Sequence, residues 1–147
     1  MNKIRFKIIT PERVLLESEV AQVTCPTQMG EITVLPNHIP LVANLVPGEI
    51  IVRDNGEAKF MAASGGVLEV RPGNEVVVLA DAAEVAEEID LKRAEEARER
   101  ARKFMAEQTL SEEEYAATSA ALERSLVRIR VAQKGKYRKL RSPESIQ

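Results

Sequence analysis

The positions of proline and glycine divide this 147-residue sequence into two parts. Six of the seven prolines and six of the seven glycines lie before residue 74, and neither type occurs between Asn74 and Lys134. Both residue types interrupt helices and favour turns, so long helices are disfavoured in the first part and allowed in the second. The sequence therefore predicts two architectures in one chain.

Short runs of β-branched residues, separated by turn signals, fill the first part. They alternate partly between apolar and polar residues, which is the period of a strand. The pair Asn55-Gly56 suits a type I′ hairpin, because both of its central residues need a positive φ. The predicted strands are Ile4–Ile9, Val14–Val23, Ile32–Leu35, Ile50–Arg53, Ala58–Ala62, Val67–Val70 and Glu75–Leu79. We expect an all-β sandwich or barrel over residues 1–86.

The second part is rich in Ala, Glu, Arg and Lys, which favour helix. Asp90 is a predicted N-cap for a first helix that runs to about Gln108. Ser111 and Glu114 form a predicted capping box at the start of a second helix. Gly135 is the predicted stop of that helix, near Lys134.

Both predicted helices carry narrow stripes of small and apolar residues, which two antiparallel helices can cover for each other. We expect an antiparallel two-helix hairpin over residues 87–134, followed by a basic, flexible tail over 135–147. The fold class is α+β. Because neither stripe is broad, the hairpin is expected to open or to exchange its partner.

Charge is distributed unevenly along the chain. Residues 1–86 carry 7 basic and 11 acidic side chains, whereas residues 87–147 carry 14 and 12. Eight basic residues and no acidic one lie between Arg124 and Arg141, which predicts either an anionic partner or a solvated helix end. The chain has no Trp, and 3% aromatic residues do not supply a stacking platform for nucleic-acid bases.

Groups that carry catalysis or bind metals are scarce. The chain has one His, one Cys, no Walker loop and no Cys/His cluster with metal-ligand spacing. His38 lies between two prolines with only Glu31 nearby, so a surface contact or plain loop packing is a better interpretation than catalysis. Cys25 is interpreted as a small buried hydrophobe. No signal peptide or membrane-spanning run is predicted.

Four arginines have a spacing that brings them together in a hairpin. Arg93 and Arg100 are seven residues apart and Arg124 and Arg128 are four apart, so each pair shares a helical face. A turn near residue 110 would place the pairs opposite each other. Such a cluster suits a polyphosphate, but ordinary pairing with neighbouring glutamates explains the spacing as well.

Three segments resemble the epsilon subunit family of the F-type rotary ATP synthase: "PNHIPLVANLVPGEI", "ASGGVLEVRPGNEVVVLADAAE" and "IDLKRA". They stand in the family's order and spacing, and the resemblance covers residues 1 to about 134. It implies a flattened β-sandwich over residues 1–86 followed by the two-helix hairpin, in a non-catalytic central-stalk subunit of a proton-translocating enzyme. The sandwich would bind the gamma subunit and the c ring, and the helices would inhibit ATP hydrolysis.

The resemblance also implies particular site residues. Thr10, Glu31 and His38 would lie at the contacts with gamma and the c ring. Arg124, Arg128, Arg130 and Lys134 would form an inhibitory basic face that meets acidic residues of the catalytic beta subunits, near alpha. A regulatory ATP site is implied at Glu84, Ile89, Asp90, Arg93, Ala94, Arg100, Arg124 and Arg128.

No catalytic residue, metal or required cofactor is expected, and ATP is expected only as a regulatory ligand. The chain would meet the membrane only through the complex, as a peripheral protein on the cytoplasmic face of a bacterial cell membrane. A nucleic-acid binder that uses residues 124–141 and a small enzyme that uses His38 and Glu31 are the alternatives. Binding to gamma would exclude both, and no nucleic-acid partner is expected.

Overall fold

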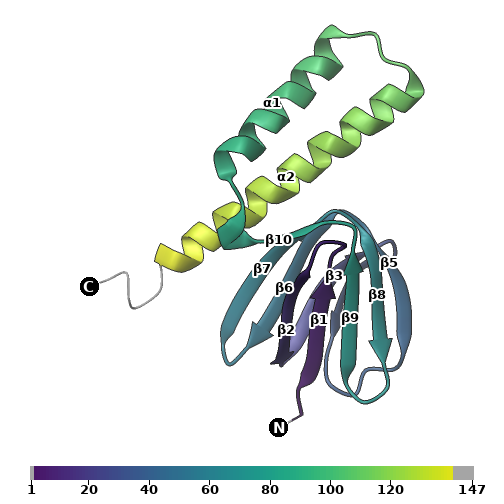
Figure 1. Ribbon diagram of the computed structural model, residues 1–147, viewed down its shortest axis with the longest axis vertical. Helices are drawn as coiled ribbons and strands as arrows, with labels where there is room; N and C mark the ends of the chain where they lie inside the picture. Colours follow the sequence, from purple (N-terminus) through teal and green to yellow (C-terminus); the bar gives the residue numbers. More distant parts are fainter. Residues whose placement is uncertain (1, 141–147) are drawn as a thin grey trace. The chain divides into compact units, whose positions relative to one another are not determined.

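The computed structural model describes the backbone of residues 2–140 and the side chains of residues 2–136. The chain divides after Val85 into two compact units, a β-sheet unit and a helical unit. This confirms the predicted α+β fold, a flattened sandwich followed by a two-helix antiparallel hairpin (Figure 1).

The first unit is a ten-stranded sheet that closes over on itself around one core (Figure 1). One layer has the order β10-β7-β6-β3, with β4 also paired to β3, and the other has the order β5-β8-β9-β1-β2. Thr27 and Leu45 pair where the two layers join. The strands are β1 Ile4–Ile9, β2 Val14–Val20, β3 Gln22–Thr27, β4 Gly30–Val34, β5 Leu41–Leu45, β6 Gly48–Asp54, β7 Glu57–Ala63, β8 Gly66–Arg71, β9 Glu75–Ala80 and β10 Ala83–Val85.

Alternation along the strands builds the core. On β1, Ile4, Phe6 and Ile8 are buried, and between them stand the more exposed Arg5 and Lys7. The rest of the core consists mainly of Ile, Val, Leu, Ala and Met side chains from both layers. Cys25 is fully buried there, and burial raises the pKa of its thiol to about 12. Its interpretation as a small hydrophobe is confirmed.

Several predictions about the strands were wrong. The run Val14–Val23 is two strands, because the chain leaves one layer for the other at Ala21, whose N–H donates to the carbonyl of Arg53. Strands β5 and β10 were not predicted. Both are short, and β5 lies between Pro40 and Pro47, residues of a type that favours turns.

Two turns required residues that tolerate a positive φ. Asn55 has φ +50° and Gly56 has φ +79°, which confirms the predicted type I′ hairpin between β6 and β7. Gly66 has φ +136°, and a methyl group on its α-carbon would overlap the carbonyl oxygen of Leu79 in the neighbouring strand β9. The chain therefore needs glycine at position 66 for two separate reasons.

We expect Gly66→Ala to lower the free energy of unfolding by about 3 kcal/mol or more, because it adds backbone strain and a steric overlap. Urea unfolding measures the change. Gly56→Ala is the matched control, since a methyl group there would meet open space, and about 1 kcal/mol of strain is the expected loss. Equal losses in the two variants would contradict the importance of the Leu79 contact.

The second unit begins with a 3-10 turn, η1, over Ala86–Glu88 and continues with two helices, α1 over Leu91–Glu107 and α2 over Glu112–Leu140. The helices pack against each other as an antiparallel pair (Figure 1). At the start of α2 the N–H of Ser111 donates to Oε2 of Glu114 at 3.0 Å, and the N–H of Glu114 donates to Oγ of Ser111 at 3.2 Å. The predicted capping box is confirmed.

The prediction that Gly135 ends the second helix was wrong. Helix α2 continues through this position to Leu140, and Gly135 does not adopt the positive φ that a helix-ending glycine uses. A methyl group on its α-carbon would lie 2.8 Å from Cβ of Ala86. Glycine at 135 therefore serves a close approach to η1. The predicted tail begins inside this helix, and its residues 141–147 lie outside the described residues.

Candidate functional site

Asp90 fixes the start of α1, as predicted. Its backbone is extended, with φ −80° and ψ 99°, and its Oδ1 accepts a hydrogen bond of 3.1 Å from the N–H of Arg93. The carbonyl of Asp90 also accepts the N–H of Ala94. One oxygen of the carboxylate is thus occupied as a helix cap, and the other remains for a ligand donor at the N-terminus of the helix.

Each helix carries a stripe of buried residues at helical spacing, and the stripe on α1 consists of small residues. Ala94 and Ala101 are buried on α1, and Ser125, Ile129 and Ala132 are buried on α2 at helical spacing. The hydroxyl of Ser125 donates to the carbonyl of Ala121 at 3.0 Å, so its burial leaves no unmade hydrogen bond. On α1 the buried side chains are the methyl groups of Ala94 and Ala101, which contribute less apolar area than leucines would.

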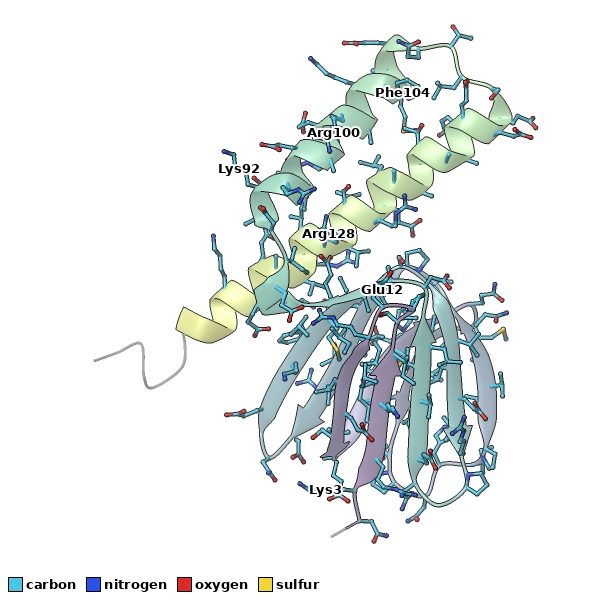
Figure 2. The ribbon with its side chains drawn as sticks, in the orientation of Figure 1. Lys3, Glu12, Lys92, Arg100, Phe104 and Arg128 are labelled. Carbon is cyan, nitrogen blue, oxygen red and sulfur yellow. The ribbon has the colours of Figure 1, made fainter. Side chains whose placement is uncertain are left out.

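The two arginine pairs flank the seam between these stripes on the same side. An α-helix turns by about 100° per residue. Viewed along the axis of α1, the side chains of Arg93 and Arg100 point about 100° behind the middle of the buried stripe, in the sense in which the chain winds. Viewed in the same way along the axis of α2, the side chains of Arg124 and Arg128 point about 90° behind the middle of the buried stripe. Because the helices are antiparallel, equal rotational offsets point to one side of the hairpin. Figure 2 labels one member of each pair, Arg100 on α1 and Arg128 on α2.

Three of the four arginines, Arg93, Arg100 and Arg124, have no ion pair with a neighbouring glutamate in the part of the chain that the structure describes. Glu99 instead contacts Arg98 at 3.5 Å and Arg102 at 3.9 Å. Arg93, Arg100 and Arg124 are exposed and form no ion pair with any residue from 2 to 136. Arg128 is half-buried. Several guanidinium groups on one side of a hairpin favour a ligand with several anionic oxygens.

The other residues predicted for the nucleotide site have different surroundings. Ala94 is fully buried, so its side chain cannot contact a ligand at the surface, whereas Ile89 is 9% exposed and its side chain is largely covered. Glu84 lies on β10, where it pairs with Ala62 of β7. It belongs to the first unit, whereas the other predicted residues belong to the second.

The residues of the predicted basic face lie on two different faces of α2. Arg128 and Arg130 are two residues apart on a continuous helix, so they point to nearly opposite sides. Arg124 and Arg128 flank the seam with α1, whereas Arg130 and Lys134 form a separate exposed pair further around α2. The prediction of a single surface was wrong, because four basic residues within eleven positions spread around an α-helix.

The predicted contact residues of the sandwich differ in exposure. Thr10 is buried, and its hydroxyl donates to the carbonyl of Arg13 at 3.2 Å and accepts the N–H of Arg13 at 3.3 Å. Its side chain therefore shapes the turn between β1 and β2. Glu31 is exposed on β4, and the loop after β4 carries His38, whose Nδ1 lies 2.6 Å from the carbonyl oxygen of Ile39.

Exposed apolar side chains near Glu31 and His38 were not predicted. Leu35 is 52%, Ile39 75%, Val42 70% and Met29 92% exposed. They lie in the β3–β4 turn, in the loop after β4 and on β5. Four large apolar side chains exposed within fourteen residues are typical of a protein contact surface. The apolar residues of "VLPNHIPLV" could have indicated this surface, but the sequence alone did not show which of them face outward.

Two kinds of site are absent from the described residues. No group of three or more His, Cys, Asp or Glu side chains in residues 2–136 is arranged to hold a metal ion. No described helix has the length and hydropathy needed to cross a membrane.

Family models match both units of the chain. The model described as ATP synthase, Delta/Epsilon chain, beta-sandwich domain matches residues 3–86. The model described as ATP synthase, Delta/Epsilon chain, long alpha-helix domain matches residues 87–133. The two matches follow each other without a gap.

Similar proteins cover most of the chain. An ATP synthase epsilon chain of Dehalococcoides mccartyi is 45% identical over 134 residues, which is 91% of this chain and 95% of the relative. One of Syntrophobacter fumaroxidans is 44% identical over 132 residues, 90% of this chain and 97% of the relative.

Solved structures share the fold. A chain in the cryo-EM structure of the Euglena gracilis mitochondrial ATP synthase OSCP/F1/c-ring has a TM-score of 0.75 and 26% identity, and the match covers 92% of this chain and 81% of that one. A chain of the Tetrahymena thermophila central stalk and c-ring structure has a TM-score of 0.61 at 17% identity and shares the fold.

Proposed function

The chain belongs to the ATP synthase delta/epsilon chain family and is a non-catalytic subunit of the central stalk, and from this we propose that its helical hairpin senses ATP and inhibits ATP hydrolysis. The β-sandwich couples the gamma subunit to the c ring. The observation that carries the regulatory part of the proposal is the position of four arginines on one side of a two-helix hairpin.

The exposed apolar side chains near Glu31 and His38 support the coupling role. Met29, Ile39 and Val42 are more than two-thirds exposed, and a subunit that docks between two partners needs such a surface. The similar Euglena gracilis chain was solved in an assembly with F1 and the c-ring. We place gamma and the c ring on this side of the sandwich, with Glu31 and His38 at the contact.

Arg93, Arg100, Arg124 and Arg128 bind the phosphates of ATP in this proposal. Guanidinium groups pair with phosphate oxygens through two parallel hydrogen bonds, and bound phosphate removes the repulsion among the four cations. The oxygen of Asp90 that does not cap α1 accepts a hydrogen bond from the adenosine end. Since α1 and α2 each supply two arginines, ATP stabilises the form in which the helices are paired.

The inhibitory form is the one in which the helices separate. An extended helix rises about 1.5 Å per residue, so a forty-residue segment spans about 60 Å and reaches from the sandwich into the catalytic head. The basic residues of α2 then meet acidic residues of the beta subunits, near alpha. The complex carries protons, and this chain acts at the cytoplasmic face of the cell membrane as a peripheral subunit.

Charge reversal at Arg130 and Lys134 tests the inhibitory contact without touching the arginines assigned to ATP. We expect Arg130→Glu/Lys134→Glu to raise ATP hydrolysis by the reconstituted complex several-fold, because like charges in the head repel the altered helix. Phosphate release measures the rate. The matched control is Lys92→Glu/Lys103→Glu on α1, which is expected to leave inhibition close to that of the original chain. Equal inhibition by all three chains would contradict the proposal.

A further inference from the structure

Gly135 occupies a position where helix geometry alone disfavours glycine. It lies inside α2, and glycine in a helix interior is less favourable than alanine by about 0.5–1 kcal/mol. It also lies beyond residue 133, where the match to the long alpha-helix family model ends. A local structural reason must therefore account for glycine here.

The reason is a close contact with Ala86. A methyl group on the α-carbon of Gly135 would lie 2.8 Å from Cβ of Ala86 and 3.6 Å from its carbonyl carbon. Ala86 is 4% exposed, and its carbonyl accepts the N–H of Ile89 at 3.3 Å, so η1 holds it in place. Cβ of alanine has no rotamer through which it could move aside, so any side chain at 135 must push α2 away from η1.

An open pocket of about 190 Å³ lies beside the contact, and Ile89, Leu91, Ala132 and Lys136 are among its lining residues. The absence of a side chain at 135 is what permits the approach. The contact joins the last turns of α2 to the segment that precedes α1, and so it closes the open end of the hairpin opposite the loop at residues 108–111.

We propose that the Ala86–Gly135 contact is a latch that holds the compact hairpin closed, and that the size of residue 135 sets the balance between compact and extended forms. In a continuous helix the two residues would be about 70 Å apart at 1.5 Å per residue, so only the compact form contains the contact. The inference rests on the proposed exchange between these two forms.

Distance measurements between two spin labels in the full chain test the latch. Cysteines at Lys92 and Gln133 provide exposed sites near the open end of the hairpin, and extension would separate them by about 60 Å. The native Cys25 is fully buried and stays unlabelled. With Ala86 and Gly135 unchanged, the two spin labels are expected to be a short distance apart. Gly135→Ala is expected to raise the ratio of long to short distances roughly tenfold, through the steric cost of overpacking.

The double variant Ala86→Gly/Gly135→Ala is the matched control. It keeps alanine at 135, and therefore the same helix propensity, but removes the methyl group that the new side chain would meet. We expect it to restore the short distance. An unchanged distribution in Gly135→Ala, or equal opening in the single and double variants, would overturn the latch.

The rate of ATP hydrolysis by the reconstituted complex shows whether the latch or the proposed function has failed. If Gly135→Ala opens the hairpin but leaves the hydrolysis rate unchanged, the latch stands and the inhibitory role of the extended form fails. If even Gly135→Leu shows only the short distance while circular dichroism reports full helix content, both the latch and the proposed exchange fail.

Discussion

A chain cut after Val85 is expected to bind the gamma subunit and to leave ATP hydrolysis uninhibited. The first unit contains a complete core of its own, including Ile4, Phe6 and Leu68, and it ends with β10, which covers the edge of β7. The cut removes every residue of α1 and α2. Hydrolysis by the reconstituted complex should therefore rise several-fold over the rate with the full chain.

Co-elution with gamma and the rate of phosphate release measure the two parts of this prediction separately. A second fragment cut after Asp81 is the control, because it loses β10 and exposes the backbone edge of β7. That fragment should be less stable but should not regain inhibition. A fragment 1–85 that is folded by circular dichroism and still fails to bind gamma would refute the docking role of the sandwich.

Calorimetric titration of the full chain with ATP is expected to show binding that Arg93→Ala and Arg128→Ala each weaken about tenfold or more. A hydrogen bond to a charged group contributes about 1.5–3 kcal/mol, and about 1.4 kcal/mol corresponds to a factor of ten in affinity. Bound ATP should also raise the melting temperature of the helical unit, by mass action on the paired form.

Arg102→Ala is the control for this titration. Arg102 has the same charge and lies on the same helix as Arg93, but it contacts Glu99, and its rotational offset from the seam is in the opposite sense. Its loss should change ATP affinity little. Absence of heat at millimolar ATP, or equal weakening by Arg102→Ala and Arg93→Ala, would refute the assigned site.

Features that depend on local residue types were predictable. Asp90 and the Ser111–Glu114 capping box were identified because a cap needs only a short polar side chain at a fixed distance from backbone N–H groups. The hairpin at Asn55-Gly56 was identified for the same kind of reason. The pairing of arginines by helical face followed from the helical repeat alone.

Features that depend on distant contacts were not predictable. The run Val14–Val23 reads as one strand, and only the switch of layers at Ala21 divides it. The sequence did not indicate that the hydroxyl of Thr10 is occupied by the backbone of Arg13. The outward direction of Ile39 and Val42 depends on how β5 enters the sheet beside β8.

The sequence by itself determined the two-part architecture, the caps of both helices and the spacing of the arginines, because each depends on the conformational preferences of residues close together in the chain. Only the tertiary structure decided that both arginine pairs lie on one side of the hairpin, that Arg130 and Lys134 lie apart from them, and that Gly135 continues a helix instead of ending it. The physical reason is that glycine suits both a left-handed helix end and a close approach of two backbones, and the surrounding atoms select between the two. Here Cβ of Ala86 makes that selection, from forty-nine positions earlier in the chain.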